Sequence, residues 1–164
     1  MKEFRGKTTK KEDENHEFNN VFVYGDLLTN KGVYYIHPQN NVFRVHNELA
    51  SILIAHEVIP ETVGQCTGST DKNGKKIFEG DIVKVSYIEK RDYQGIKYDN
   101  EFELIETVVY NEKSACFMLE IDNEEITMFR PLHDFGNEVS IKSIEVIGNI
   151  YDNRELLENG NEEN

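Results

Sequence analysis

The sequence predicts a mainly β protein, with an N-terminal β-hairpin plus short helix region followed by a small C-terminal barrel. Runs of β-branched and aromatic residues alternate with turn residues through most of the 164-residue chain, and one segment has the spacing of an amphipathic helix. We therefore expect three parts: residues 1–59, a barrel at residues 60–152, and a short helical turn with a frayed acidic tail at residues 153–164.

The first part should begin with a strand near Phe4, followed by a solvated charged loop. Residues 21–24 and 34–36 then predict a hairpin, because Thr29-Asn30-Lys31-Gly32 between them supplies turn residues. Two interpretations remain open for its tyrosines, Tyr24, Tyr34 and Tyr35. They form either cross-strand aromatic pairs, which is the commoner use, or an aromatic platform for a ligand.

Residues 47–57 are expected to form the helix. Leu49, Ile52, Leu53 and His56 fall at helical spacing, and Asn47 can cap the start. We expect this helix to pack on the hairpin; a dimerisation face is the alternative.

Residues 60–85 are the centre of the prediction because they combine a turn, a glycine break and the clearest strand. Asn73-Gly74 suits a two-residue type I′ hairpin, in which both residues have positive φ. Gly80-Asp81 forms the break, and Val83, Val85 and Tyr87 then share one face of a strand. Residues 89–101 should form a long polar loop.

Further strands are expected at residues 102–110, 115–121, 126–129 and 144–151. Together with residues 82–88 they make five, the number that a small SH3-like barrel uses, and closure leaves few unpaired edges. Residues 153–157 should form a capped helical turn whose leucines pack on the barrel.

Three pieces of the chain resemble the YopX family, small proteins encoded mostly by phages and prophages of Gram-positive bacteria. The longest piece is VGQCTGSTDKNGKKIFEGDIV at residues 63–83. The N-terminal piece is FRGK at residues 4–7 followed by FVYGDLL at residues 22–28, and the C-terminal piece is VIGNIY at residues 146–151. The sequence departs from the family pattern at Cys66, where an aromatic residue is usual, and at Arg154, where proline is common. The resemblance implies an SH3-like barrel for the C-terminal part and no particular activity.

The formal net charge of −13 speaks against sequence-independent nucleic-acid binding, which depends on lysine and arginine neutralising phosphates. Most of the excess acid lies in residues 89–106, 112–125 and 152–164, whereas residues 60–85 are neutral. The chain has no apolar run long enough to span a membrane and no secretory signal, so we expect a cytoplasmic location in a bacterial host.

No motif for catalysis or cofactor binding is present in the sequence. Cys66 and Cys116 lack metal-site spacing and are expected to be reduced, and the five histidines form no HxH or HxxxH pair. Neither a phosphate-binding loop nor a nucleophile elbow occurs. We therefore expect no enzyme, no cofactor and no metal.

The leading hypothesis is a non-catalytic phage or prophage accessory protein that binds a host or phage protein and that can form a homo-oligomer. Its candidate binding residues are the polar side chains of the family-like stretch, which are Gln65, Thr67, Asp71, Lys72 and Asp81. Each also has a structural interpretation, such as turn formation by Asp81. The alternative hypothesis is a nucleic-acid-related role, either binding through the lysines of residues 72–84 or acidic mimicry of nucleic acid.

Overall fold

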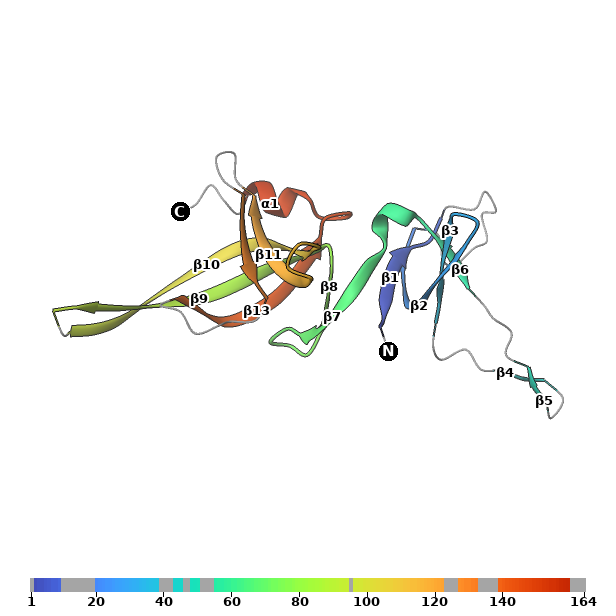
Figure 1. The fold of residues 1–164 in the computed structure, drawn as a ribbon, viewed down its shortest axis with the longest axis horizontal. Coiled ribbons are helices and arrows are strands. Elements are labelled where there is room, and N and C mark those ends of the chain that lie inside the picture. The colour runs from blue at the N-terminus through green and yellow to red at the C-terminus, as the bar shows by residue number, and fades with distance from the viewer. Residues whose placement is uncertain are drawn as a thin grey trace. The chain divides into compact units, whose positions relative to one another are not determined.

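A computed structural model describes residues 2–9, 20–38, 43–45, 48–50, 55–94, 96–122, 127–132 and 139–159. It is mainly β with one short α-helix among these residues, which confirms the predicted fold class (Figure 1). The chain divides into two compact units, Met1–Cys66 and Thr67–Asn164, and the boundary falls inside strand β7, Gly64–Thr70. The sequence had suggested a division between residues 59 and 60.

The first sheet has six strands in the order β6-β3-β2-β1-β7-β8. Its strands β6, β3, β2 and β1 belong to unit 1, β7 crosses the boundary, and β8 belongs to unit 2. The predicted hairpin is confirmed, since β2 pairs with β3 from Asp26 and His37 to Asn30 and Val33. Lys31 and Gly32 both have positive φ, at 49° and 82°, as a two-residue type I′ turn requires. The elements of this unit are β1 (Phe4–Lys7), β2 (Phe22–Asn30), β3 (Val33–His37), β4 (Phe43–Val45), β5 (Glu48–Ala50), β6 (His56–Val58) and the 3₁₀ helix η1 (Pro60–Thr62).

The core of unit 1 is a cluster formed by Val23, Ile36 and Val58, all at most 7% exposed. Tyr34 packs against this cluster, whereas Tyr24 on the opposite face of the sheet is 47% exposed. The three tyrosines therefore do not form one platform, because side chains alternate between faces along a strand.

The helix predicted over residues 47–57 is wrong where the structure describes this segment. Residues 48–50 form β5 and residues 56–58 form β6, while residues 46–47 and 51–54 lie outside the described residues. Pairing with β3 decides the conformation of β6, since Val58 lies opposite Tyr34 and is 1% exposed. Burial in a sheet therefore outweighs the helical spacing. The alternative of a helical dimerisation face is also wrong for the described residues, since they form strands.

Unit 2 contains a five-stranded antiparallel sheet in the order β12-β11-β10-β9-β13. Its strands correspond to the five that the sequence predicts. They are β9 (Asp81–Tyr93), β10 (Ile96–Asn111), β11 (Cys116–Asp122), β12 (Thr127–Pro131) and β13 (Val139–Asn149). The short strand β8 (Lys76–Phe78) precedes them, and the helix α1 (Glu155–Asn159) follows at the predicted helical turn.

The core of unit 2 forms on one face of β9. Val83 and Val85 are fully buried and Tyr87 is 2% exposed, so the predicted shared face is confirmed. Ile77, Val108, Leu119 and Leu132 complete the buried cluster. Apolar alternation in the sequence therefore located this core correctly.

A closed SH3-like barrel is not found in the described part of unit 2. The sheet is open there, with β12 and β13 as its two edges. The edge of β13 is instead covered by a turn: Lys72 N–H donates to Ile144 O at 2.9 Å, and Val146 N–H donates to the Asp71 carboxylate at 3.1 Å. Backbone groups that would bind a closing strand are thus satisfied by a turn.

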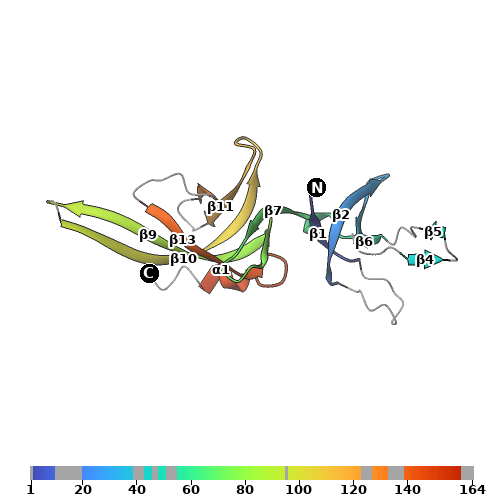
Figure 2. The same cartoon turned by 90° about the horizontal axis from the view of Figure 1, so that it is seen from below.

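The predicted polar loop at residues 89–101 is also wrong, because these residues extend the β9–β10 hairpin. Pairing runs from Tyr87 and Phe102 out to Tyr93 and Ile96, beyond the last β13 pair at Glu89 and Val139. Both views show this extension passing beyond β13 (Figures 1 and 2). The sequence did not predict this extension, because a two-stranded ribbon that is exposed to solvent on both faces has no alternation of apolar and polar residues.

No helix in the described residues has the length and apolar character needed to cross a membrane.

Candidate functional site

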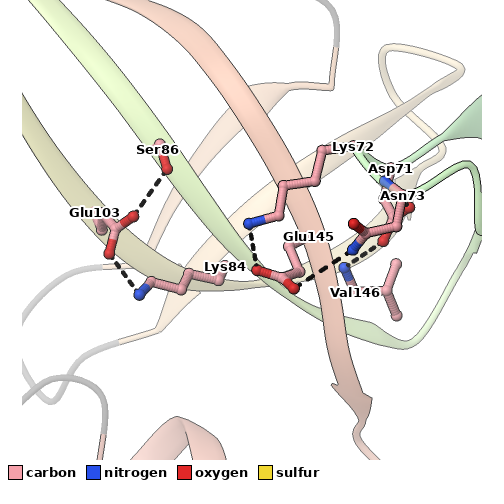
Figure 3. A network of polar contacts seen from close by, with 8 residues as sticks. All are labelled: Asp71, Lys72, Asn73, Lys84, Ser86, Glu103, Glu145 and Val146. Atoms are coloured by element: carbon pink, nitrogen blue, oxygen red, sulfur yellow. Dashed lines mark hydrogen bonds and ion pairs between the residues drawn. The ribbon is translucent and has the colours of Figure 1, made fainter.

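The family-like stretch places a compact turn, residues 71–75, on one edge of the unit 2 sheet (Figure 3). Asp71 is 7% exposed and organises this turn. One carboxylate oxygen accepts the N–H groups of Asn73 at 2.8 Å and Lys75 at 2.9 Å, and the other accepts Val146 N–H. A single side chain therefore both closes the turn and fixes it to β13.

The conformation of this turn differs from the predicted type I′. Gly74 has a φ of 81°, but Asn73 is not among the residues with positive φ. Gly74 N–H donates to Asp71 O, and Asp71 N–H donates to Lys75 O, as in a type I turn followed by a left-handed glycine. The hydrogen bonds from the turn N–H groups to Asp71 favour this longer loop over the two-residue turn.

The environment of Asp71 lowers the pKa of its carboxyl group below the usual value. Burial acts to raise this pKa, but the backbone hydrogen bonds from Val146, Lys75 and Asn73 stabilise the charged form and outweigh burial. Asp71 is thus held as a carboxylate with its oxygens engaged, which suits a structural role and not general acid–base chemistry.

A line of charged side chains, here called the polar face, crosses β13, β9 and β10 beside this turn. Lys72 forms an ion pair with Glu145 at 2.6 Å, and Glu145 lies opposite Lys84 in the β13–β9 register. Lys84 in turn pairs with Glu103, to which the Ser86 hydroxyl donates at 3.0 Å. Figure 3 shows the alternating sequence of signs along this line.

These contacts shift the pKa values of the polar face toward the charged forms. Hydrogen bonding and charge from Lys72 lower the pKa of Glu145, Lys84 and then Ser86 lower that of Glu103, and Glu103 raises that of Lys84. The paired side chains are between 35% and 52% exposed, so each pair adds little stability. The consequence is a solvent-facing surface in which both signs are locally neutralised.

The structure does not gather the five candidate binding residues into one exposed patch. Lys72 is the exposed member, whereas Asp71 and Asp81 are buried and Gln65 and Thr67 are half-buried. Gln65 lies in unit 1, where it pairs with Phe4 across β1 and β7. A binding role for the set stays a prediction.

Two of these residues have clear structural contacts. Asp81 is 1% exposed and accepts Phe78 N–H at 2.8 Å across a turn in which Gly80 has a φ of 80°. The Thr67 hydroxyl donates to Ile77 O at 3.0 Å and accepts Ser69 N–H at 3.1 Å. Both side chains are therefore used to hold the strands and turns around β8 in place.

The sequence analysis did not predict a buried polar pair, Glu106 and Tyr87. Glu106 is fully buried and accepts a hydrogen bond from the Tyr87 hydroxyl at 2.6 Å, next to the core cluster of unit 2. Glu106 is one acid among many in residues 89–106, and its burial becomes visible only when the register opposite Val83 is known. The parity of β10 was the available signal, since Phe102, Leu104 and Val108 share its face.

No group of three or more histidine, cysteine, aspartate or glutamate side chains among the described residues is placed to hold a metal ion. Cys66 and Cys116 are free thiols, half-buried and located in different units.

The fold defines a class: a two-unit, mainly β protein with an antiparallel sheet in each unit. A family model described as YopX protein matches residues 3–158, which is nearly the whole chain and spans both units. The protein therefore belongs to the YopX family, and the resemblance inferred from its sequence pieces is confirmed. No curated protein matches the chain.

Proposed function

We propose that this YopX-family protein is a non-catalytic accessory protein of phage or prophage origin that acts in the bacterial cytoplasm by binding another macromolecule. The observation that carries the proposal is the polar face of unit 2. Small-molecule sites are concave and mostly apolar, whereas this surface is an open sheet face with ion-paired side chains. A non-obligate protein–protein interface is about as polar as the rest of a protein surface and has a polar rim, so a surface of this composition is compatible with a protein partner.

The distribution of charge indicates the chemistry of the partner. Unit 2 holds 11 basic and 22 acidic residues, a formal charge of −11, whereas unit 1 holds 7 basic and 9 acidic residues, a charge of −2. An acidic domain attracts a basic surface and speeds the encounter with it. The partner that fits best is therefore a host or phage protein with a basic face.

Direct nucleic-acid binding through the lysines of residues 72–84 has weaker support. Lys72 is paired with Glu145 and Lys84 with Glu103, so phosphate would have to displace a carboxylate at both positions. The net charge of −13 adds repulsion at longer range. Acidic mimicry of nucleic acid remains the alternative, and it uses the same basic partner.

Affinity capture from host lysate tests the proposal, with the full chain as bait and bound proteins identified by mass spectrometry. We expect a specific protein to be recovered equally with and without nuclease treatment. A bait carrying Glu103→Lys and Glu145→Lys, which gives the polar face the same sign of charge as the partner's basic surface, should recover less of it. A bait with Glu57→Lys and Glu61→Lys, two exposed acids of unit 1, is the control for charge. Recovery of no partner, or loss of the partner on nuclease treatment, would overturn the proposal.

A further inference from the structure

Asn73 and Gly74 form an exposed Asn-Gly pair within the turn at residues 71–75. An asparagine followed by glycine can cyclise when the backbone nitrogen of the glycine attacks the side-chain carbon of the asparagine, because no side chain on the glycine hinders the approach. Nothing lies within 4 Å of the position that a Cβ atom would occupy at Gly74. The pair is therefore accessible to water and sterically free to react.

The closed turn holds both groups that would react. Gly74 N–H donates to Asp71 O at 3.0 Å, and this proton is the one that the nitrogen must lose before it can attack. Asn73 N–H donates to the Asp71 carboxylate at 2.8 Å, and the Asn73 side-chain amide donates to Glu145 at 3.5 Å. Figure 3 shows this amide directed toward Glu145 on β13. Cyclisation therefore requires the turn to open and its hydrogen bonds to break.

Asp71 is the residue that keeps this turn closed. Its carboxylate accepts the N–H groups on either side of Gly74, from Asn73 and from Lys75. Its backbone carbonyl accepts the Gly74 N–H group itself. The same carboxylate fixes the turn to β13 through Val146 N–H. Opening thus breaks several hydrogen bonds to one buried, charged side chain, and such bonds are the stronger ones in proteins.

We propose that Asn73 is a site of spontaneous deamidation and that Asp71 holds it unreactive in the closed turn. In the opened turn, the Gly74 nitrogen loses its proton and bonds the Asn73 Cγ atom, the Cγ–Nδ2 bond breaks, and the amide nitrogen leaves as ammonia. Water then opens the resulting succinimide at either carbonyl, which gives aspartate or isoaspartate. The reaction consumes water and releases ammonia, with no change of oxidation state.

The products cannot form the same turn again. Aspartate replaces the amide that donates to Glu145 with a second negative charge beside that carboxylate. Isoaspartate lengthens the backbone between the N–H groups of residues 73 and 74, both of which donate to Asp71. Either product should weaken the attachment of the turn to β13, so a transient opening becomes a permanent one.

Deamidation of the full chain in mildly alkaline buffer tests this proposal. Mass spectrometry of proteolytic peptides, with fragmentation to place the change, measures the loss of the amide at Asn73. The second Asn-Gly pair of the chain, Asn159-Gly160, is measured in the same digest and is the internal reference for solution conditions. Relative to this reference, Asn73 of the wild type should react about tenfold or more slowly in the folded protein than in urea, because only the opened turn reacts.

Two variants test the role of Asp71. Asp71→Asn should speed deamidation of Asn73 in the folded protein about tenfold and leave the rate at Asn159 unchanged, because an amide replaces one of the two accepting oxygens with a donor. Asp99→Asn, at an exposed residue of β10, is the matched control and should leave both rates unchanged. Circular dichroism checks that the variants fold, and the wild-type comparison with urea needs no variant. Equal wild-type rates at Asn73 with and without urea, or equal rates in the two variants, would overturn the proposal.

Discussion

At the scale of single residues, Asp71 shows how one side chain determines the local structure of the family-like stretch. Its carboxylate accepts three backbone N–H groups, two from its own turn and one from β13, which is far away in the sequence. Aspartate suits this position because it is short, charged and able to accept several hydrogen bonds at once. Asparagine has the same shape but replaces one accepting oxygen with a donor.

We expect Asp71→Asn to lower the free energy of unfolding of unit 2 by about 1–3 kcal/mol, because at least one buried N–H group loses its acceptor. Urea unfolding at neutral pH measures this change. The control is Asp99→Asn, an exposed residue of β10, which should change stability by less than about 0.5 kcal/mol. Equal effects of the two substitutions would show that the hydrogen bonds to Asp71 do not matter for stability.

The pH dependence of Asp71 gives a separate prediction. Because folding lowers the pKa of this carboxyl, its stabilising contribution is complete above the pKa of the unfolded chain, about 3.9, and is lost as the pH falls through the lower folded pKa. The stability gap between wild type and Asp71→Asn should therefore be constant near neutral pH and narrow in acid. A gap that widens toward low pH would contradict this assignment.

Gly25 is a second residue whose identity is dictated by its surroundings. A Cβ atom at this position would lie 2.0 Å from the His37 carbonyl oxygen, a backbone atom that cannot rotate away. We expect Gly25→Ala to destabilise unit 1 by about 3 kcal/mol or more. Gly32→Ala is the control: with a φ of 82° and nothing within 4 Å, it should cost only about 1–2 kcal/mol. Thermal unfolding of both variants separates a steric clash from backbone strain.

At the scale of secondary structure, the sequence predicts a strand well where one face of that strand is buried. Val83, Val85 and Tyr87 alternate with the more exposed Lys84 and Ser86, and the strand they predict lies between β10 and β13 in the unit 2 sheet. The two wrong elements lack this signal. Helical spacing at residues 47–57 competed with pairing to β3, and residues 90–92 and 98–100 of the β9–β10 hairpin are exposed to solvent. The periodicity of apolar residues reflects the burial of one face, so it gives no signal for a segment that is exposed on both faces.

The candidate site was partly predictable for the same reason. Turn formation by Asp81 follows from its place after Gly80, and the stretch around Lys72 stands out by its turn residues. Glu145 and Glu103 could not be assigned to the polar face from the sequence, because the register of β13 and β10 against β9 decides which side chains meet. Long-range register is the information that a local pattern does not carry.

Hydrogen exchange should distinguish the two halves of the β9–β10 hairpin. Residues 82–88 of β9 are paired on both sides, with β10 and with β13, whereas residues 90–93 and 96–99 pair only with each other within the described part of the chain. We expect exchange of the first group to need global unfolding of unit 2, and exchange of the second group to be faster by orders of magnitude. Equal protection of both groups would contradict this.

At the scale of the whole molecule, two separate hydrophobic clusters predict two unfolding units. Val23, Ile36 and Val58 form the buried cluster of unit 1, and the buried cluster around Val83 and Leu119 belongs to unit 2. The two clusters share no member. Cooperative unfolding follows shared burial, so each cluster is expected to melt as its own transition.

Truncation of one core residue in each unit tests this expectation by calorimetry. Ile36 and Leu119 are both fully buried, so Ile36→Ala and Leu119→Ala should each cost about 2–5 kcal/mol. Because the cavity is local, Ile36→Ala should lower the midpoint of one transition and Leu119→Ala that of the other, while the untouched unit keeps its wild-type midpoint. The double variant should show both shifts added, since substitutions in clusters that share no member are expected to act independently. A single transition lowered equally by either substitution would mean that the two units unfold together, and that the continuous strand β7 couples them more strongly than their separate cores suggest.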